Sequence, residues 1–146
     1  MRERACAVVL SEDKLIFMKQ IVNGRERRVF IGGGIENGET AEQAILRELN
    51  EEANVSGELL FGPVNLQIGQ HNEHIFVVNI GFQKPTLGYD PELPEDRQDI
   101  KEIIAIEIRD KVFNSRDMTY VSKILEEAKH KGIKDTWVDK LKKASI

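Results

Sequence analysis

Three glutamates in the segment 32–55 have spacings that place their carboxylates on one side of a helix. Glu48 precedes Glu51 and Glu52 by three and four residues, and residues at these separations share a helix face. Like charges at such spacings repel by about 0.2–0.5 kcal/mol per pair. The negative end of the helix dipole adds to this cost, because the glutamates lie near the C-terminus of the predicted helix. A hard divalent cation such as Mg²⁺ would relieve the repulsion, so the cluster predicts a metal site.

A carboxylate cluster of this kind is suited to the cleavage of a phosphoanhydride bond. The reaction requires that charge on the phosphate oxygens is neutralised and that a water molecule attacks in line. Carboxylates can hold one or more Mg²⁺ ions, which bridge the phosphate oxygens and lower the pKa of bound water. A carboxylate that is not fully used as a ligand can accept the proton. Glu48, Glu52 and Glu102 are all candidates for this base, and the sequence does not choose among them.

The cluster needs a helix to hold it, and the sequence predicts one over residues 40–53. Thr40 and Gln43 form a capping box at its start. Asn54 follows the last turn, and asparagine tolerates the left-handed conformation that is common just past a helix end. The residues predicted to face the interior are Ala41, Ala44, Ile45, Leu49 and Ala53.

Three glycines precede this helix at positions 32–34. Glycine permits backbone angles that are closed to other residues, and it lets a ligand approach the main chain closely. The predicted helix is roughly 20 Å long at 1.5 Å per residue, so its acidic end does not meet the glycines through the helix itself. The glycine segment must therefore fold back along the helix if both are to contact one ligand.

The rest of the chain predicts further strands and helices around this segment. Between 84 and 99 the chain holds several prolines among acids, which is typical of a lid or binding loop. Strands are predicted at 4–10, 15–19, 27–31, 58–70, 74–83 and 102–108, and helices at 116–131 and 136–144. In the strand at 74–83, alternation indicates one strongly apolar face. The order of elements predicts an α+β fold with helices on a mixed sheet.

Length and composition limit the classes of protein that the chain can belong to. A chain of 146 residues is long enough for one domain, 1–146, with a substantial core. With 40% hydrophobic and 32% charged residues, it has the composition of a soluble globular protein. The net charge of −4 disfavours binding to a nucleic acid polymer. A small polyphosphate can still bind if metal ions supply the positive charge.

A single cysteine, Cys6, excludes an intramolecular disulfide and favours a reducing cytoplasm. It stands in a predicted apolar strand, so we expect a core residue rather than a nucleophile. No apolar stretch reaches the length that spans a membrane, and the start of the chain lacks the apolar run of a secretory signal. We therefore expect a cytoplasmic protein without a membrane partner.

The pattern around the three glutamates resembles the Nudix box. Eight of the nine specified positions of that motif match, with Asn54 where the family has glycine. The surrounding residues 4–40 also look like the opening of a Nudix domain, and the resemblance covers about residues 2–110. The matching positions are Gly33, Glu39, Arg47, Glu48, Leu49, Glu51, Glu52 and Val55.

The resemblance implies an α/β/α sandwich with a mixed sheet and an Mg²⁺-dependent pyrophosphohydrolase, with Mn²⁺ as an alternative ion. The substrate would be a small-molecule nucleotide, a nucleoside diphosphate linked to another group. Glu51 and Glu52 resemble the metal ligands of the family, joined by Glu48 and the main-chain carbonyl of Gly32. The resemblance does not fix the number of metal ions. It allows a homodimer, because dimers are common among relatives.

Further roles follow from the same resemblance. Arg47 resembles the arginine that orients the carboxylates, and it can also reach Glu51. Glu39 resembles the acid that braces the glycine loop against the helix. Glu102 lies where many members carry a further glutamate that acts as a ligand or base. The other candidates for that role are Glu95, Asp96 and Asp99.

The chain departs from the family near the glycines. Ile31 stands where proline usually precedes them, and Arg28 occupies a place often held by an aromatic residue. Arg28 therefore suggests a phosphate or other anionic contact in place of base stacking. Gly33 and Gly34 would approach the substrate through the main chain. The side chains that could bind phosphate beyond the metal are Lys19, Arg25, Arg27 and Arg28.

Two functions from different classes fit these residues. The first is hydrolysis of a nucleoside triphosphate, oxidised or not, a nucleotide sugar or ADP-ribose. The second is a non-catalytic nucleotide-binding regulatory module on the same fold. Such modules typically lose carboxylates of the box, whereas this chain keeps all of them, so the sequence favours the enzyme.

Overall fold

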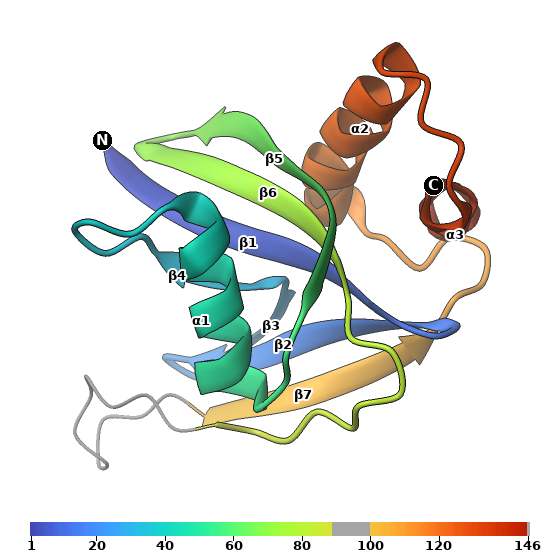
Figure 1. Ribbon diagram of the computed structural model, residues 1–146. Helices are drawn as coiled ribbons and strands as arrows, with labels where there is room; N and C mark the ends of the chain where they lie inside the picture. Colours follow the sequence, from blue (N-terminus) through green and yellow to red (C-terminus); the bar gives the residue numbers. More distant parts are fainter. Residues whose placement is uncertain (89–99, 146) are drawn as a thin grey trace.

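A mixed sheet forms the middle layer of the molecule, and helices lie on both of its faces (Figure 1). The computed structural model describes residues 1–88 and 100–145, and within these ranges seven strands belong to the sheet. The strands are β1 (Arg2–Ser11), β2 (Lys14–Val22), β3 (Arg25–Val29), β4 (Ile31–Gly34), β5 (Glu58–Ile68), β6 (His71–Asn79) and β7 (Ile100–Glu107). The helices are α1 (Ala41–Ala53), α2 (Ser115–His130) and α3 (Thr136–Ala144). The predicted α+β class is confirmed.

β1 organises the sheet because both of its edges are paired. One edge runs parallel to β6 along residues 2–10. The other edge is divided, since residues 4–7 pair with β4 and residues 9–11 pair with β2. β2 in turn pairs with β3 and β7, whereas β4 pairs with β1 alone among the described strands. The sheet is therefore split beside β4, which leaves room for a groove at that point.

The predicted single strand over 27–31 is wrong, because the chain forms two strands there. β3 ends at Val29 and β4 begins at Ile31, so Phe30 separates a strand paired with β2 from one paired with β1. Val29 and Ile31 pack into the core beneath α1, whereas Phe30 packs into the core on the other face. The chain thus crosses the split in the sheet at Phe30.

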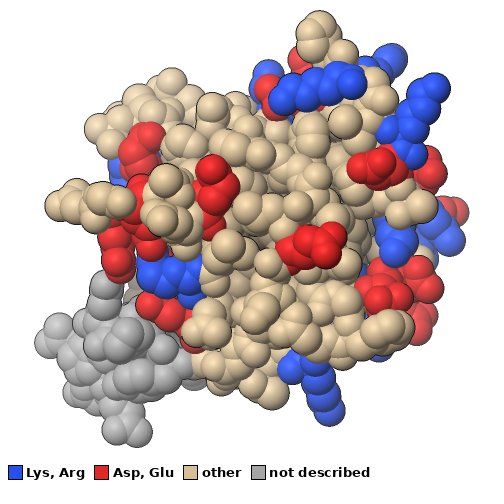
Figure 2. Space-filling model, in the orientation of Figure 1, with Lys and Arg blue, Asp and Glu red and all other residues tan. Residues whose placement is uncertain are grey.

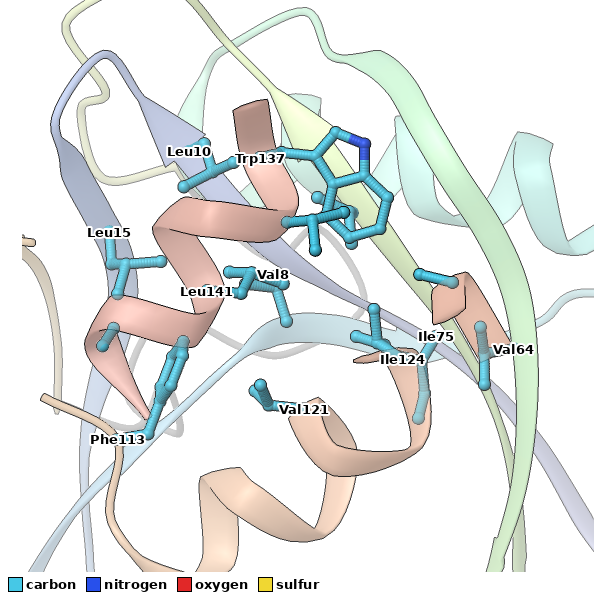
Figure 3. Packing of buried hydrophobic residues seen from close by; sticks show 14 of the residues in the cluster. Val8, Leu10, Leu15, Val64, Ile75, Phe113, Val121, Ile124, Trp137 and Leu141 are labelled. Carbon is cyan, nitrogen blue, oxygen red and sulfur yellow. The ribbon is translucent and has the colours of Figure 1, made fainter. Parts of the chain in front are cut away.

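The sheet buries residues on both faces. Along β1, Ala5 and Ala7 belong to the core beneath α1, and Cys6 and Val8 belong to the core beneath α2 and α3. Figure 3 shows Val8 among the side chains of the second core. Cys6 is thus a core residue, as expected, and burial raises the pKa of its thiol. The prediction of one apolar face over 74–83 is wrong. Both faces of β6 are apolar because helices cover both sides of the sheet.

α1 begins and ends as the sequence predicts. Thr40 is the N-cap and makes a reciprocal capping box with Gln43, whose backbone N–H lies 3.1 Å from the Thr40 hydroxyl. Asn54 follows the helix with φ 54° and ψ 40°, which is the left-handed conformation. None of the described helices has the length and apolarity needed to cross a membrane.

The segment that follows β6 covers the C-terminal end of α1. The backbone N–H of Thr86 donates to the carbonyl of Ala53 at 3.0 Å, and that of Gly88 donates to the carbonyl of Glu52 at 2.8 Å. The amide of Asn54 also donates to the carbonyl of Thr86 at 3.2 Å and to its hydroxyl at 3.0 Å. These contacts satisfy carbonyls that a helix end otherwise leaves unpaired. Asn54 therefore does more than replace a glycine, because its side chain fixes the neighbouring segment.

Candidate active site

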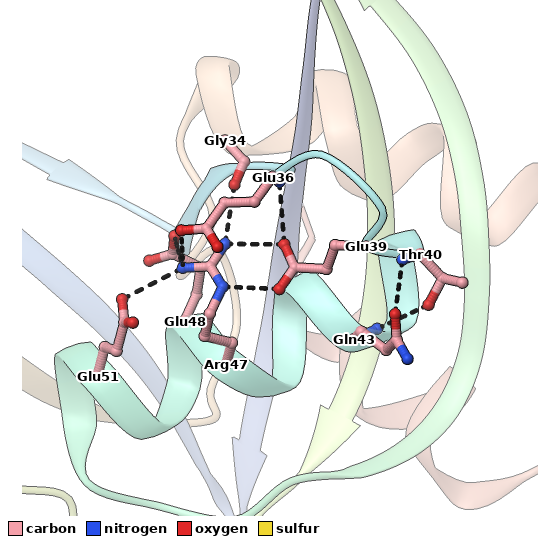
Figure 4. Close-up of polar contacts among 8 residues, drawn as sticks. All are labelled: Gly34, Glu36, Glu39, Thr40, Gln43, Arg47, Glu48 and Glu51. Atoms are coloured by element: carbon pink, nitrogen blue, oxygen red, sulfur yellow. Dashed lines mark hydrogen bonds and ion pairs between the residues drawn. The ribbon is translucent and has the colours of Figure 1, made fainter.

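The three glutamates of α1 line a groove of about 890 Å³ that opens beside β4. Glu48, Glu51 and Glu52 all contribute to its wall, together with the glycines of β4 and Lys101 of β7. The glycine segment therefore does fold back along the helix. In Figure 4, Gly34 lies beside the middle of α1 rather than beyond its start.

Arg47 joins the helix to the segment that precedes it (Figure 4). Its Nε and Nη2 atoms donate to the two carboxylate oxygens of Glu39 at 2.7 and 3.0 Å. Nη2 also donates to the carbonyl of Gly34 at 3.0 Å, and Nη1 donates to Glu48 at 3.0 Å and to Glu51 at 3.2 Å. Bidentate pairing of this kind fixes the direction of both partners. Arg47 thereby positions two of the clustered carboxylates relative to β4.

Glu39 holds the turn between β4 and α1. It accepts a hydrogen bond from the backbone N–H of Glu36 at 3.0 Å, in addition to the two from Arg47. The hydrogen bonds from Arg47 are the main reason that the pKa of Glu39 lies below its ordinary value. Glu39 therefore stays ionised and keeps the turn close to the helix.

Glu48 is the most buried of the three glutamates, with 8% of its surface exposed. The pKa of Glu48 is raised to about 7, mainly by burial and then by the charge of Glu52, while Arg47 opposes the rise. The sequence pattern places Glu48 beside the inward-facing stripe of α1, but its burial depends on β4, which the pattern does not locate. A carboxyl whose pKa lies near neutrality suits proton transfer.

Gly33 makes room for the Glu48 carboxylate. A Cβ atom at Gly33 would lie 2.3 Å from Oε1 of Glu48, which is far inside contact distance. A Cβ atom at Gly32 would instead lie 2.4 Å from the carbonyl oxygen of Ala5. Both glycines belong to the extended strand β4, and neither has the positive φ that favours glycine. The expectation of unusual backbone angles is therefore wrong, because Gly32 and Gly33 allow close packing, whereas the close approach of a ligand to the main chain stays a prediction.

Lys101 pairs with Glu52, with 3.5 Å between Nζ and Oε1. Arg47 and Lys101 therefore offset part of the negative charge of the acidic cluster. Within residues 1–88 and 100–145, no three acidic, histidine or cysteine side chains converge closely enough to hold a metal ion in this arrangement. Sequence reasoning missed Lys101, although alternation with Ile103, which packs beneath α1, could have placed it on the same face.

Glu102 lies on the opposite face of the sheet from α1. Its carboxylate pairs with Lys19 at 3.6 Å, and Lys19 also pairs with Glu26 at 2.8 Å. The neighbouring Ile104 packs into the core beneath α2 and α3, as alternation along β7 requires. The structure therefore does not bring Glu102 to the carboxylates of α1. The rivals Glu95, Asp96 and Asp99 lie outside the described residues.

Arg28 and Arg27 are neighbours in β3, so their side chains lie on opposite faces of the sheet. Arg28 donates through Nη2 to Asp117 at 2.5 Å and to the carbonyl of Val112 at 3.1 Å, and its guanidinium lies over the ring of Phe17. It joins β3 to the region of α2, away from the acidic cluster. Arg27 lines the groove and donates through Nε to Gln20 at 3.3 Å.

A row of polar side chains crosses three strands on the face of the sheet that α1 covers. Gln20 of β2 is the register partner of both Arg27 and Lys101, so the three side chains share one face of the sheet. All three line the groove. The arrangement can receive an anionic group beside the carboxylates of α1, and only Arg27 of this row was singled out from the sequence.

Comparison with known proteins agrees with this geometry. The family model described as NUDIX domain matches residues 1–114. A search of curated proteins gave no match. Among solved structures, one similar chain comes from a study of MutT from Aliivibrio salmonicida and Vibrio cholerae. It has 16% identity and a TM-score of 0.64, covering 86% of this chain and 98% of that one.

Two further solved structures are similar in fold. An ADP compounds hydrolase has 19% identity and a TM-score of 0.60, with 90% of this chain and 75% of that chain covered. A NUDIX family hydrolase from Clostridium perfringens has 15% identity and a TM-score of 0.55, with 88% and 94% covered. At these identities the likeness shows the fold, and the family rests on the match over residues 1–114. The chain belongs to the NUDIX family.

Proposed function

We propose that the protein hydrolyses a phosphoanhydride bond in a nucleoside diphosphate derivative with the help of Mg²⁺, with Mn²⁺ as an alternative. One observation carries the proposal. Glu48, Glu51 and Glu52 line one groove together with basic side chains, so the groove can receive both a metal ion and a phosphate chain. The substrate is a small nucleotide rather than a nucleic acid polymer. Figure 2 shows acidic and basic side chains side by side on the face it displays.

The donor set fits a hard divalent cation. Three carboxylates and the carbonyl of Gly32 are all oxygen donors, which Mg²⁺ prefers. Glu48, Glu51, Glu52 and Gly32 would hold the ion once the ion pair between Lys101 and Glu52 loosens. When bound, the metal supplies charge neutralisation on the phosphate oxygens and an acidified water.

The protein's own residues supply position, charge and a proton acceptor. Arg47 keeps Glu48 and Glu51 directed into the groove through its hydrogen bonds to Glu39 and to the β4 backbone. Glu48 or Glu52 accepts the proton, and the raised pKa of Glu48 supports it for this role. Arg27 and Lys101 bind the phosphate groups that extend past the carboxylates.

The test is turnover of a nucleotide panel with Mg²⁺ or Mn²⁺, combined with one substitution and one control. The panel holds nucleoside triphosphates, oxidised forms among them, nucleotide sugars and ADP-ribose. Glu52→Gln is expected to lose orders of magnitude in turnover and to weaken Mg²⁺ binding in calorimetry while it folds normally. Glu42→Gln changes an exposed glutamate in the first turn of the same helix and should change neither. Full metal-dependent activity in Glu52→Gln contradicts the site assignment.

One observation favours a second function, a nucleotide-binding module without catalysis. Arg47 pairs with Glu48 and Glu51, and Lys101 pairs with Glu52, so each carboxylate of the cluster has a basic partner without a metal ion. The same panel separates the two functions. Binding of a nucleotide without turnover of any substrate, with either metal, identifies the module.

A further inference from the structure

Glu73 carries a buried carboxylate oxygen without a protein partner. The residue is 6% exposed, and its Oε1 accepts a hydrogen bond from Nε of Arg4 at 3.1 Å. Its Oε2 is buried and has no hydrogen-bond partner within residues 1–88 and 100–145. The thiol of Cys6 lies nearby, and the charge of Glu73 helps to raise the pKa of that thiol after burial itself. A thiol is only a weak donor, so the oxygen retains capacity for a stronger one.

An oxygen of this kind is costly unless something donates to it. A buried acceptor left unsatisfied costs about 1–3 kcal/mol, and more when it is charged. Glu73 lines the same groove as the carboxylates of α1, so a bound ligand can reach it. The ion pair with Arg4 satisfies Oε1 of the carboxylate, whereas no described residue donates a hydrogen bond to Oε2.

The two parts of the groove lie on the two faces of β4. A Cβ atom at Gly33 would meet Glu48, and one at Gly32 would meet Cys6, so successive residues of the strand face different sides. Glu73 is the register partner of Arg4, on the same face of the sheet as Cys6. A ligand that passes the edge of β4 with which no described strand pairs can therefore contact Glu48 with one end and Glu73 with the other.

The part around Glu73 has aromatic walls. Phe30 and Tyr120 both line the groove, with ring centroids 5.6 Å apart and rings nearly perpendicular. Asp117, which is 2% exposed, lines it as well. Aromatic side chains pack against the flat faces of nucleobases, and carboxylates accept hydrogen bonds from their edges. This composition differs from the α1 side of the groove, where Arg47, Lys101 and the three glutamates of α1 contribute to the lining.

We propose that this part of the groove binds the base of the nucleotide and that Glu73 selects a base with two adjacent N–H donors. The proposal rests on the proposed function, because it assigns the other end of the same substrate. Among the common bases, guanine has this pattern, with N1–H beside the N2 amino group. Adenine, cytosine and uracil place an acceptor next to the donor on that edge, and the Glu73 carboxylate, which can only accept when it is ionised, repels such an acceptor. The substrate class is therefore a guanine nucleotide.

Binding of nucleoside monophosphates to the wild-type protein tests this. Monophosphates contain no phosphoanhydride bond, so their affinity can be measured by calorimetry whether or not the protein is an enzyme. GMP is expected to bind about tenfold or more tightly than AMP, and more tightly than IMP, which lacks the N2 amino group. Equal affinities for GMP and AMP, or no binding of any monophosphate at millimolar concentration, overturn the proposal.

A second test changes the protein instead of the ligand, through the substitution Glu73→Gln. The amide keeps the size of the side chain and an acceptor for Arg4, but it turns a donor toward the base. We expect the preference for GMP over AMP to vanish in this variant. Glu58→Gln, an exposed position on neighbouring β5, should keep it. An unchanged preference in a folded Glu73→Gln protein overturns the assignment. If that variant does not fold, the comparison of GMP, IMP and AMP on the wild-type protein decides.

The two proposals can fail separately. Absence of turnover on every nucleotide, with GMP still preferred, contradicts the hydrolytic function and leaves the base site standing. Turnover with equal kcat/KM for guanine and adenine substrates contradicts the base site and leaves the hydrolase standing.

Discussion

Gly33 shows how a single missing methyl group positions a carboxylate. Its Cα lies so close to Glu48 that alanine would bring a Cβ atom 2.3 Å from Oε1. We expect Gly33→Ala to push the Glu48 carboxylate out of place and to reduce kcat/KM about a hundredfold, as small misplacements in active sites do. Gly34→Ala should cost much less, because its Cβ atom would meet only the flexible end of Arg2, at 3.4 Å. Steady-state kinetics and Mg²⁺ calorimetry on both variants test this, and equal losses would contradict it.

Lys101 tests the balance of charge at the metal site. Its ammonium lies 3.5 Å from Glu52, so it competes with a divalent cation for the same carboxylate. Lys101→Met is expected to bind Mn²⁺ about tenfold more tightly, since partly buried charges at such distances interact by about 1–4 kcal/mol. The matched control is Lys19→Met, which removes a lysine on the other face of the sheet. Unchanged Mn²⁺ affinity in the Lys101 variant contradicts the competition.

The raised pKa of Glu48 predicts how the metal-free protein responds to pH. In the folded state the pKa of Glu48 lies at about 7, against an ordinary value of 4.5. Folding therefore favours the protonated form, so this contribution to stability is complete below pH 4.5 and is lost as the pH rises to about 7. The loss is at most about 3 kcal/mol. Urea unfolding in chelator across this range measures it, and Glu48→Gln should remove that part of the pH dependence.

At the scale of elements, the end of α1 is coupled to the segment that follows β6. A Cβ atom at Gly88 would lie 1.6 Å from the carbonyl oxygen of Glu51, so only glycine fits this close approach. Gly88→Ala is expected to lift the segment from the helix end and to lower the free energy of unfolding by about 1–3 kcal/mol. Asn54→Gly keeps the left-handed cap but removes the amide contacts, and it should cost about 1 kcal/mol. Chemical denaturation of both variants checks the order of these effects.

The helices were easier to predict than the strands. The capping box at Thr40 and the left-handed Asn54 are local signals, and α1 starts and ends where they indicate. The change from β3 to β4 at Phe30 depends on tertiary packing. Val29 and Ile31 pack beneath α1, whereas Phe30 packs on the other face of the sheet. No local pattern separates that arrangement from one continuous strand.

At the scale of the whole molecule, the sequence could predict which residues carry chemistry but not which face of the sheet they occupy. The motif identified Glu48, Glu51 and Glu52, and all three line one groove. It also suggested Glu102, which the register of β7 places on the opposite face. A one-residue difference in register exchanges Glu102 for Lys101, and that register depends on pairing with a distant strand.

The division of the groove by β4 predicts that the two ends of the substrate bind independently. Glu52 lies on one face of the strand, where it pairs with Lys101, and Glu73 lies on the other, where it accepts a hydrogen bond from Arg4. Well-separated sites without shared partners contribute additively to binding. Thermal shift measurements can therefore use one ligand for each end: guanosine for the base, and methylenediphosphonate with Mg²⁺ for the phosphates. Glu73→Gln should lose the shift with guanosine alone, and Glu52→Gln should lose the shift with methylenediphosphonate alone. If either variant loses both shifts, β4 does not divide the groove into separate sites.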